Sequence, residues 1–282
     1  MATVAVVGLG LMGASFALAM KERGHVVVGA DTDQRTVQKA LAHGVVSSAT
    51  QDLEIVDIAD VVVLAVPILA MHATLTELTG RTAGKVVTDM ASTKLMVMRW
   101  AEQAGVDLVG GHPMCGRETS GIDAADASLF RGAPWILTEG RPEVVRLVEE
   151  AGAHPIVMSA EDHDRLVSGV SHAAFLLSVA YVLSLSRRSD WPDASHVASS
   201  GFRDMSRLAA GDPGLYAGVS ATNRENLIAQ LDEISATLAR MRRHLEAGDS
   251  RLIELFEEAR RVRERWSRDA QSHPPGGPSG PS

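Results

Sequence analysis

The chain has 282 residues, of which 45% are hydrophobic and only 4% aromatic, and its formal net charge is −8. This length suffices for two domains. The acidic balance argues against nucleic-acid binding, and we expect no apolar run long enough to span a membrane. The single cysteine, Cys115, rules out an intramolecular disulfide. Together with an opening apolar strand in place of a signal peptide, it predicts a cytoplasmic protein.

The N-terminus carries a dinucleotide-binding pattern. Residues 4–7 predict a short buried strand, and residues 14–20 predict a helix of small and apolar residues. Between them stands a glycine turn that consists of Gly8, Leu9, Gly10, Leu11, Met12 and Gly13. In this motif the first glycine allows a tight turn, the second lets the backbone meet a pyrophosphate, and the third lets helix and strand pack closely. We therefore expect all six residues to contact the cofactor.

An acidic residue in the expected place specifies the cofactor further. A second strand, residues 25–30, ends at Asp31, which lies 18 residues after Gly13. A carboxylate there accepts hydrogen bonds from the ribose hydroxyls of NAD and repels the 2′-phosphate of NADP. The alternative is that Asp31 only caps a turn. The apolar strand 61–67 adds Val66 and Pro67 to the expected cofactor contacts, because it ends at the same edge of the sheet.

Strands and helices alternate up to residue 158. Further strands are predicted at residues 85–88, 106–109, 133–137 and 155–158, with a helix at 142–151. Ligands of open α/β sheets bind beyond the C-terminal strand ends. We therefore predict a Rossmann domain, residues 1–158, with a doubly wound, mostly parallel sheet that binds NAD.

Helical patterns replace strands after residue 158. We predict an all-helical domain, residues 159–268, with long helices at 162–185, 221–247 and 250–267. Residues 173–185 are so apolar that a partner subunit is expected to cover them, which indicates a homodimer. The segment 269–282, rich in proline and glycine, is expected to be a disordered tail.

His112 is the leading candidate for catalysis. It stands among glycines in the segment 110–121, directly after a predicted strand, and a histidine there can exchange a proton with a ligand near neutral pH. The alternative is a turn histidine without chemistry. Cys115 in the same segment is interpreted as a packing residue rather than a reactive thiol. The histidines are scattered without ligand spacing, so no metal is predicted.

Four other polar residues are candidates for the same cleft. Ser92 follows a strand end and either holds a substrate hydroxyl or caps a helix at 94–103. Lys94 meets a carboxylate or the cofactor, or is solvated. Arg203 and Arg207 have helical i, i+4 spacing; we assign the first to an ion pair with Asp204 and the second to a substrate carboxylate. For His172, on an apolar helix, core packing and function both stay open.

These motifs together resemble the prephenate/arogenate dehydrogenase family, from residue 1 to about 266. The resemblance rests on the glycine turn and on five further segments: Asp89-x-x-Ser92-x-Lys94, Gly111-His112-Pro113-Met114-x-Gly116-x-Glu118-x-Ser120-Gly121, Ser171-His172, Gly201-Phe202-Arg203-Asp204-x-x-Arg207-x-Ala209 and Asn223-Arg224. It implies a cytoplasmic, NAD-dependent enzyme of tyrosine biosynthesis with a Rossmann domain and a dimerisation domain. Its substrate would be prephenate, oxidised and decarboxylated to 4-hydroxyphenylpyruvate, or arogenate, converted to tyrosine.

The resemblance also implies site roles. His112 would accept the proton of the ring hydroxyl, Ser92 would hold that hydroxyl near the nicotinamide, and Arg207 would bind a carboxylate. Phe175 and Tyr216 replace a histidine and a tryptophan that many members carry on the helical side of the pocket. They are therefore expected, with His172 and Lys94, to touch the substrate, and they leave prephenate, arogenate and an amino-substituted prephenate open.

Two other classes stay as alternatives. An enzyme of the β-hydroxyacid dehydrogenase kind would need a lysine on the helix at 162–185, which has none. A non-catalytic, dimeric NAD-binding protein would bind the cofactor without turnover.

Overall fold

The computed structural model describes residues 1–116 and 119–272. Its N-terminal part is built on a six-stranded sheet with the order β3-β2-β1-β4-β5-β6, in which all paired strands are parallel. The strands are β1 (Thr3–Val7), β2 (Val26–Ala30), β3 (Ser48–Thr50), β4 (Val61–Leu64), β5 (Val86–Asp89) and β6 (Leu108–Val109). The order reverses between β1 and β4, which is the switch point where such sheets bind their ligand. The Rossmann prediction is confirmed.

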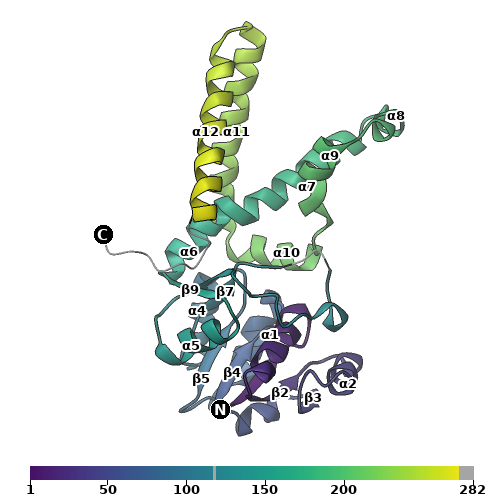
Figure 1. Cartoon of the computed structure of the whole chain (residues 1–282). Coiled ribbons are helices and arrows are strands. Elements are labelled where there is room, and N and C mark those ends of the chain that lie inside the picture. The colour runs from purple at the N-terminus through teal and green to yellow at the C-terminus, as the bar shows by residue number, and fades with distance from the viewer. Residues whose placement is uncertain (117–118, 273–282) are drawn as a thin grey trace.

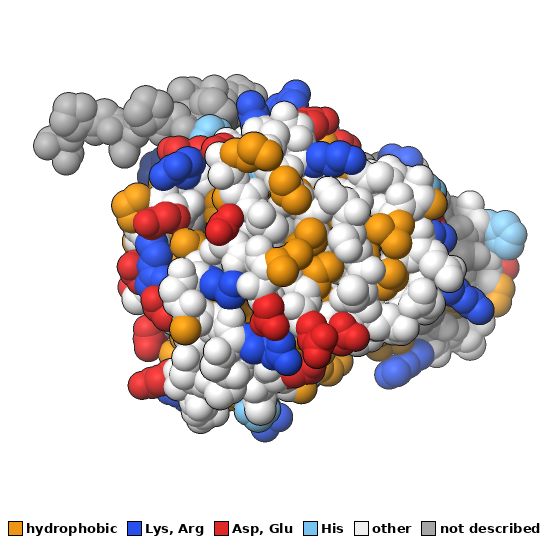
Figure 2. Space-filling view, turned by 90° about the horizontal axis from the view of Figure 1, so that it is seen from below, with side chains coloured by type: hydrophobic (Ala, Val, Ile, Leu, Met, Phe, Trp, Pro, Cys, Tyr) orange, Lys and Arg blue, Asp and Glu red, His pale blue; other side chains and the backbone are white. Residues whose placement is uncertain are grey.

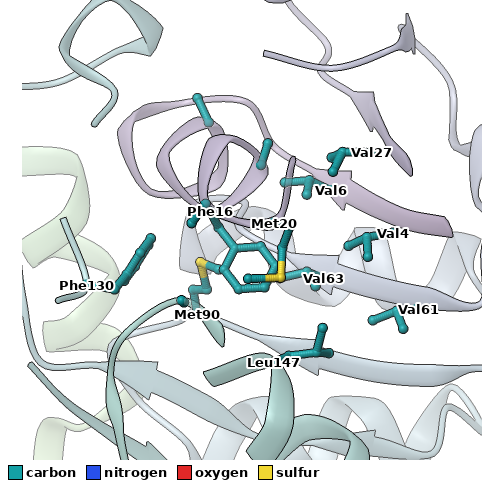
Figure 3. Close-up of a cluster of buried hydrophobic side chains, with 14 of the residues drawn as sticks. Val4, Val6, Phe16, Met20, Val27, Val61, Val63, Met90, Phe130 and Leu147 are labelled. Atoms are coloured by element: carbon teal, nitrogen blue, oxygen red, sulfur yellow. The ribbon is translucent and has the colours of Figure 1, made fainter. Parts of the chain in front are cut away.

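Helices cover both faces of this sheet, because side chains along each strand alternate between the faces. The helices are α1 (Leu11–Glu22), α2 (Gln34–Ala42), α3 (Ile68–Glu77), α4 (Leu95–Gln103) and α5 (Pro142–Glu150), with a 3-10 turn η1 at Leu53–Ile58. Val4 and Val6 of β1 belong to the core beneath α1 and α5, while Ala5 and Val7 belong to the core beneath α3 and α4. Figure 3 shows Phe16 of α1 within the first of these cores.

A second, small sheet carries the His112 segment. Strand β7 (Gly111–Pro113) pairs antiparallel with β8 (Pro134–Leu137), and β8 pairs parallel with β9 (His154–Val157). His112 therefore stands in the middle of a strand, opposite Ile136, rather than on a loop as the sequence suggested. The expected strands near 133–137 and 155–158 exist, but they belong to this sheet and not to the six-stranded one.

The remainder of the described chain is helical and follows a short 3-10 turn η2 (Ile122–Ala124) and the small sheet. It comprises α6 (Ala160–Val167), a π-helical turn η3 (Ser168–His172), α7 (Ala173–Ser186), α8 (Trp191–His196), α9 (Ser200–Ser206), a 3-10 turn η4 (Arg207–Ala210), α10 (Pro213–Thr222), α11 (Arg224–Ala247) and α12 (Arg251–Ser272). In Figure 1, α11 and α12 run side by side as a long hairpin that projects away from the sheets, and α7 leaves the domain junction in another direction.

Three helix predictions need correction. The expected helix at 162–185 is continuous but contains the π turn, and the expected helix at 221–247 is two helices separated at Asn223. Asn223 leaves helical geometry (φ −126°, ψ 33°) because its side chain turns inward to bond Asp164 and His172. Helix α12 continues to Ser272, into the segment expected to be disordered, and the rest of that tail lies outside the described residues.

Within residues 1–116 and 119–272, one helix is long and apolar enough to span a membrane by length and composition alone, contrary to the expectation from sequence. It is the continuous run Ala160–Ser186, with a mean hydropathy of 1.8 in its most apolar window and 33% of that window buried. Its first half carries His163 and Asp164, which are fully buried against the Rossmann domain. A helix anchored in this way is a weak candidate for a membrane span, and its apolar second half is the part that we expected a partner subunit to cover.

The face of the Rossmann domain that lies away from the helical hairpin has a mixed surface. Seen from below, acidic and basic side chains are interspersed among small groups of apolar ones (Figure 2). No single charge sign dominates this view, although the chain as a whole is acidic.

Candidate active site

The glycine turn fits a dinucleotide pyrophosphate. Gly8 has φ +92°, and a Cβ there would lie 2.6 Å from the Ala65 carbonyl oxygen at the end of β4. A Cβ on Gly13 would lie 1.9 Å from the Gly8 oxygen, so only glycine lets α1 pack this closely. At Gly10, by contrast, a Cβ would meet no described atom within 4 Å. Gly10 opens α1, so the N–H groups of the first turn face this open space, where an anion is favoured.

Asp31 stands at the end of β2, beside the glycine turn. Its carboxylate accepts hydrogen bonds from the backbone N–H of Leu9 at 2.8 Å and of Asp33 at 2.9 Å. The helix cap next to it is Asp33, which accepts from Arg35 N, so Asp31 is not the cap of α2. A carboxylate oxygen accepts more than one hydrogen bond, so the half-buried Asp31 retains capacity for ribose hydroxyls. Val66 and Pro67 follow β4 on the other side of the switch point.

A buried ion pair holds the His112 strand against the main sheet. The Lys94 ammonium binds the Asp89 carboxylate and the Gly111 carbonyl oxygen, and both charged side chains are fully buried. Asp89 also accepts from Gly111 N and Ala91 N, each at 2.8 Å. Burial lowers the pKa of Lys94, and the neighbouring Asp89 opposes that shift. The expectation that Lys94 binds substrate is wrong in this structure, because its ammonium is enclosed and committed to the protein.

His112 is the first member of a buried chain of polar groups. Its Nδ1 lies 2.8 Å from Nε2 of His163 in α6, and His163 Nδ1 lies 2.7 Å from Asp164 Oδ1. The Asp164 carboxylate also accepts from Lys94 N at 2.7 Å and Leu95 N at 3.0 Å, at the start of α4. Asp164, rather than Ser92, therefore caps α4. This chain joins the small sheet, α4 and α6 at one point.

The surroundings of His112 keep its ring neutral. The side chain is 8% exposed. Its pKa lies well below the ordinary 6.5, first because burial penalises the imidazolium and second because His163, Lys94 and His172 add repulsion. At neutral pH His112 is therefore an uncharged imidazole with a nitrogen lone pair, which is the protonation state that a general base requires.

His172 ends the π turn at the domain junction. It is buried, and its Nδ1 lies 3.3 Å from the side-chain nitrogen of Asn223, which donates its other bond to the Asp164 carbonyl oxygen at 2.8 Å. Burial lowers the pKa of His172 to about 4, against the opposing effects of Asp164 and the backbone of Ser92. Among the described atoms its Nε2 is one of three buried side-chain nitrogens or oxygens that lack a hydrogen-bond partner. A buried polar atom without a partner is unusual, and a bound water molecule or ligand would satisfy it.

Ser92 lies half-buried in the segment that follows β5. The next residue, Thr93, shares a 2.9 Å hydrogen bond with Thr222 of α10, so the helical part of the chain fixes this segment from the other side. Ser92 thus follows the C-terminal end of β5, the strand end at which the sequence placed it, and its backbone lies beside His172, which the sequence did not predict.

The helical part adds an aromatic wall and a cation. Phe175, one turn after His172, stacks on Tyr216 of α10 with a centroid distance of 3.4 Å. Arg207 lies close enough to Tyr216 to act on the Tyr216 pKa, which burial raises and Arg207 lowers. Arg203 is exposed and lies 3.8 Å from Asp204. The two arginines do not share one α-helical face, because α9 ends at Ser206 and a 3-10 turn begins at Arg207.

Sequence reasoning missed His163 and Asp164. They stand in α6 next to Asp162, so the sequence presents them as part of an acidic, polar first turn, and only the fold shows that they point inward. Cys115 is half-buried, and burial raises the pKa of its thiol to about 11, which agrees with a packing role. Arg117 and Glu118 of the same motif lie outside the described residues. Among the described residues, no cluster of His, Cys, Asp and Glu is placed to hold a metal ion.

The fold and this site define an NAD-linked dehydrogenase with a nucleotide-binding domain and a helical domain. Family models agree: residues 16–157 match the prephenate dehydrogenase nucleotide-binding domain and residues 159–258 match the prephenate dehydrogenase dimerization domain. The chain belongs to the prephenate dehydrogenase family, and it is an oxidoreductase with NAD as its cofactor.

Individual relatives support this placement along almost the whole chain. A prephenate dehydrogenase of Lactococcus lactis is 31% identical over 94% of this chain and 77% of its own length. A cyclohexadienyl dehydrogenase of Zymomonas mobilis is 30% identical over 92% and 94%. The crystal structure of prephenate dehydrogenase from A. aeolicus with hydroxyphenyl propionate and NAD+ matches with a TM-score of 0.88 at 28% identity, over 94% of this chain and 98% of that one. Synechocystis arogenate dehydrogenase matches with a TM-score of 0.81 at 31% identity, over 94% and 99%.

Proposed function

We propose that this enzyme oxidises the ring alcohol of prephenate with NAD and releases carbon dioxide and 4-hydroxyphenylpyruvate, in tyrosine biosynthesis in the cytoplasm. The observation that carries the proposal is the buried, neutral His112 at the C-terminal edge of the sheet, where the glycine turn and Ser92 also lie. The glycine turn and Asp31 would hold NAD, which would supply the hydride acceptor for the ring carbon that carries the hydroxyl.

The chain's own residues supply binding and proton transfer. As the hydride leaves, the alcohol carbon becomes a carbonyl, so the hydroxyl proton has to be removed at the same time. Neutral His112 takes that proton on a ring nitrogen, and Ser92 holds the hydroxyl by a hydrogen bond. Loss of carbon dioxide then returns the C–C bonding pair to the ring and makes it aromatic. The resulting phenolate oxygen regains the proton from His112.

The helical part of the site would hold the rest of the substrate. Arg207 is assigned to a substrate carboxylate, for which a guanidinium offers two parallel hydrogen bonds. His172 lies at the junction with no hydrogen-bond partner for Nε2 among the described side-chain contacts, and the stacked Phe175 and Tyr216 lie near Arg207. Binding of the carboxylates and the hydroxyl at fixed places is most of what the reaction needs, because aromatisation drives the second step.

A homodimer is part of the proposal. Val170 is 78% exposed, and Leu176, Leu227 and Ile228 help to line an open groove of about 420 Å³ between α7, α10 and α11. Apolar surface of this kind is usually covered by a partner in a soluble protein. The match to a family dimerization domain supports a second copy of this chain as that partner.

Arogenate is the second candidate substrate. It differs from prephenate in an amino group in place of the side-chain keto group, and the stacked Phe175 and Tyr216 rings are uncharged, so the two rings themselves do not choose between the substrates. The test is the formation of NADH by the purified enzyme, with prephenate and arogenate at equal concentrations. Turnover of prephenate with release of 4-hydroxyphenylpyruvate is expected. Turnover of arogenate alone would move the assignment to tyrosine formation, and binding of NAD without any turnover would favour a non-catalytic protein.

A further inference from the structure

We propose that His163 and Asp164 form a positioning dyad that fixes the tautomer of His112, so that Nε2 of His112 is the nitrogen that takes the substrate proton. This inference rests on the proposed role of His112 as the base. It assigns a function to two buried residues that the reaction itself does not touch. The dyad acts on the reaction only through His112. The evidence for this role is the hydrogen-bonded series His112, His163 and Asp164, in which the donor of each hydrogen bond can be assigned.

The order of donors starts at Asp164. Its carboxylate accepts from two backbone N–H groups, Lys94 N at 2.7 Å and Leu95 N at 3.0 Å, at the beginning of α4. These donors and the positive end of the α4 dipole favour the ionised carboxylate, which accepts hydrogen bonds only. The Nδ1 atom of His163, at 2.7 Å from Asp164 Oδ1, therefore has to be the donor and carries a proton.

The next hydrogen bond transmits this choice. A neutral imidazole with a proton on Nδ1 has a bare Nε2. Nε2 of His163 lies 2.8 Å from Nδ1 of His112, and the rings cross at 70°, so the bare Nε2 accepts a hydrogen bond from the protonated Nδ1 of His112. His112 is then left with a bare Nε2. Asp164 thus selects, through His163, which ring nitrogen of His112 is basic. A third group fixes the orientation of a histidine in the same way in other catalytic and metal sites.

The charges that face His112 explain why the enzyme needs such a dyad. His163 approaches it from α6, Lys94 from the segment before α4, and His172 from the π turn, and each opposes an imidazolium on His112 only while it carries a positive charge itself. The Lys94 charge is balanced locally by Asp89. When His112 takes the substrate proton, Asp164 is the anion that is hydrogen-bonded in line behind it, through His163. The dyad therefore also stabilises the charge that forms during the reaction.

The first test reads the tautomer directly and needs no substrate. Nitrogen-15 NMR of histidine-labelled, NAD-bound enzyme distinguishes protonated from bare ring nitrogens, and a His112→Asn spectrum identifies the His112 signals. We expect a protonated Nδ1 and a bare Nε2 on His112. The reverse pattern, with the proton on Nε2, would overturn the proposal, because His163 would then be the donor to His112.

The second test reverses the order of donors without changing the shape of the site. In Asp164→Asn with the amide nitrogen in the place of Oδ1, the amide oxygen still accepts from Leu95 N, while the NH₂ donates to His163 Nδ1 and Lys94 N loses its acceptor. The proton of His163 then moves to Nε2, and His112 loses its basic Nε2. We expect kcat to fall by roughly 100-fold or more, since a general base contributes about 10²–10⁴. NAD affinity should not change. His163→Gln, whose amide oxygen can still accept from His112 Nδ1, should retain more activity than His163→Leu.

A matched control separates positioning from stability. Ser159 caps the same helix, α6, by accepting from Asp162 N at 3.1 Å, and it lies outside the chain of contacts. Ser159→Ala should lower the unfolding temperature and leave kcat and the His112 NMR signals unchanged. If Asp164→Asn leaves kcat unchanged, the dyad is structural only and the proposal fails. If the enzyme oxidises no cyclohexadienol but the ring nitrogens have the expected protonation, the proposed function fails while the positioning of His112 stands.

Discussion

The buried Lys94–Asp89 pair gives the sharpest prediction about stability. Both side chains are fully buried, and the pair ties β5 to the His112 strand through Gly111. Lys94→Met keeps most of the side-chain volume but leaves the Asp89 carboxylate without its counter-charge. Removal of one partner of a buried pair destabilises a protein by about 3–5 kcal/mol. Asp89 keeps its bonds from Gly111 N and Ala91 N, so we expect a loss near the lower end, about 3 kcal/mol.

The assay is urea unfolding of the enzyme without NAD, with kcat and KM measured on the same preparations. Lys85→Met is the matched control, because Lys85 Nζ bonds only two carbonyl oxygens, of Asp57 at 3.0 Å and Ala59 at 2.6 Å, among the described residues. Its loss should cost about 1 kcal/mol. Lys94→Met should also lower kcat, since the strand that carries His112 loses an anchor.

A double substitution measures the pair itself. Asp89→Asn with Lys94→Met removes both charges, so the pair should show a coupling of about 1 kcal/mol or more relative to the sum of the single changes. The reasoning is refuted if Lys94→Met unfolds at the same urea concentration as the wild-type enzyme and instead raises KM. That result would return Lys94 to the substrate-binding role that its sequence context suggested.

The other predictions concern the base, the cofactor, the carboxylate and pH. His112→Asn should lower kcat by about 100-fold or more with NAD affinity unchanged; equal losses of both would remove the base role. Since its pKa lies well below 6.5, wild-type kcat/KM should stay level as pH falls through 6.5 and decline only in more acidic solution. Asp31→Ser should weaken NAD and narrow its advantage over NADP, which ITC with both cofactors would measure, and an unchanged ratio would reduce Asp31 to a turn residue. Arg207→Ala should mainly raise KM for substrate; an unchanged KM would exclude it from carboxylate binding. The folded-state pKa of His172, about 4, lies below the ordinary 6.5, so the unfolded chain binds more protons between these values and stability should fall as pH drops from 6.5 toward 4, by up to about 3 kcal/mol. His172→Asn should flatten that decline in urea unfolding at pH 7 and 5, and an equally steep decline would assign the pH dependence to other groups.

Local patterns were enough to predict the cofactor half of the molecule. The glycine turn, the strand that ends at Asp31 and the break after β4 each depend on a few neighbouring residues, because tight turns and helix starts are set locally. These three features lie at one edge of the sheet because its strands are parallel, so the C-terminal ends of the strands lie together. The prediction of an α/β domain followed by helices is confirmed for the same reason.

Long-range pairing explains what the sequence could not predict. Lys94 has the same local context whether it is solvated or buried, and only the approach of Gly111 and Asp89 decides between these states. Asp164 and His163 face inward because α6 packs against the start of α4. Asn223 interrupts an otherwise periodic helical pattern for the sake of hydrogen bonds to residues more than 50 positions away.

The most direct test of the central claim is a crystal structure of this enzyme with NAD+ and a 4-hydroxyphenyl carboxylic acid that mimics the product. We predict that the phenolic oxygen lies within hydrogen-bond distance of His112 Nε2 and Ser92, beside the nicotinamide ring, with the carboxylate toward Arg207. A ligand whose phenolic oxygen contacts neither His112 nor Ser92 would contradict the account.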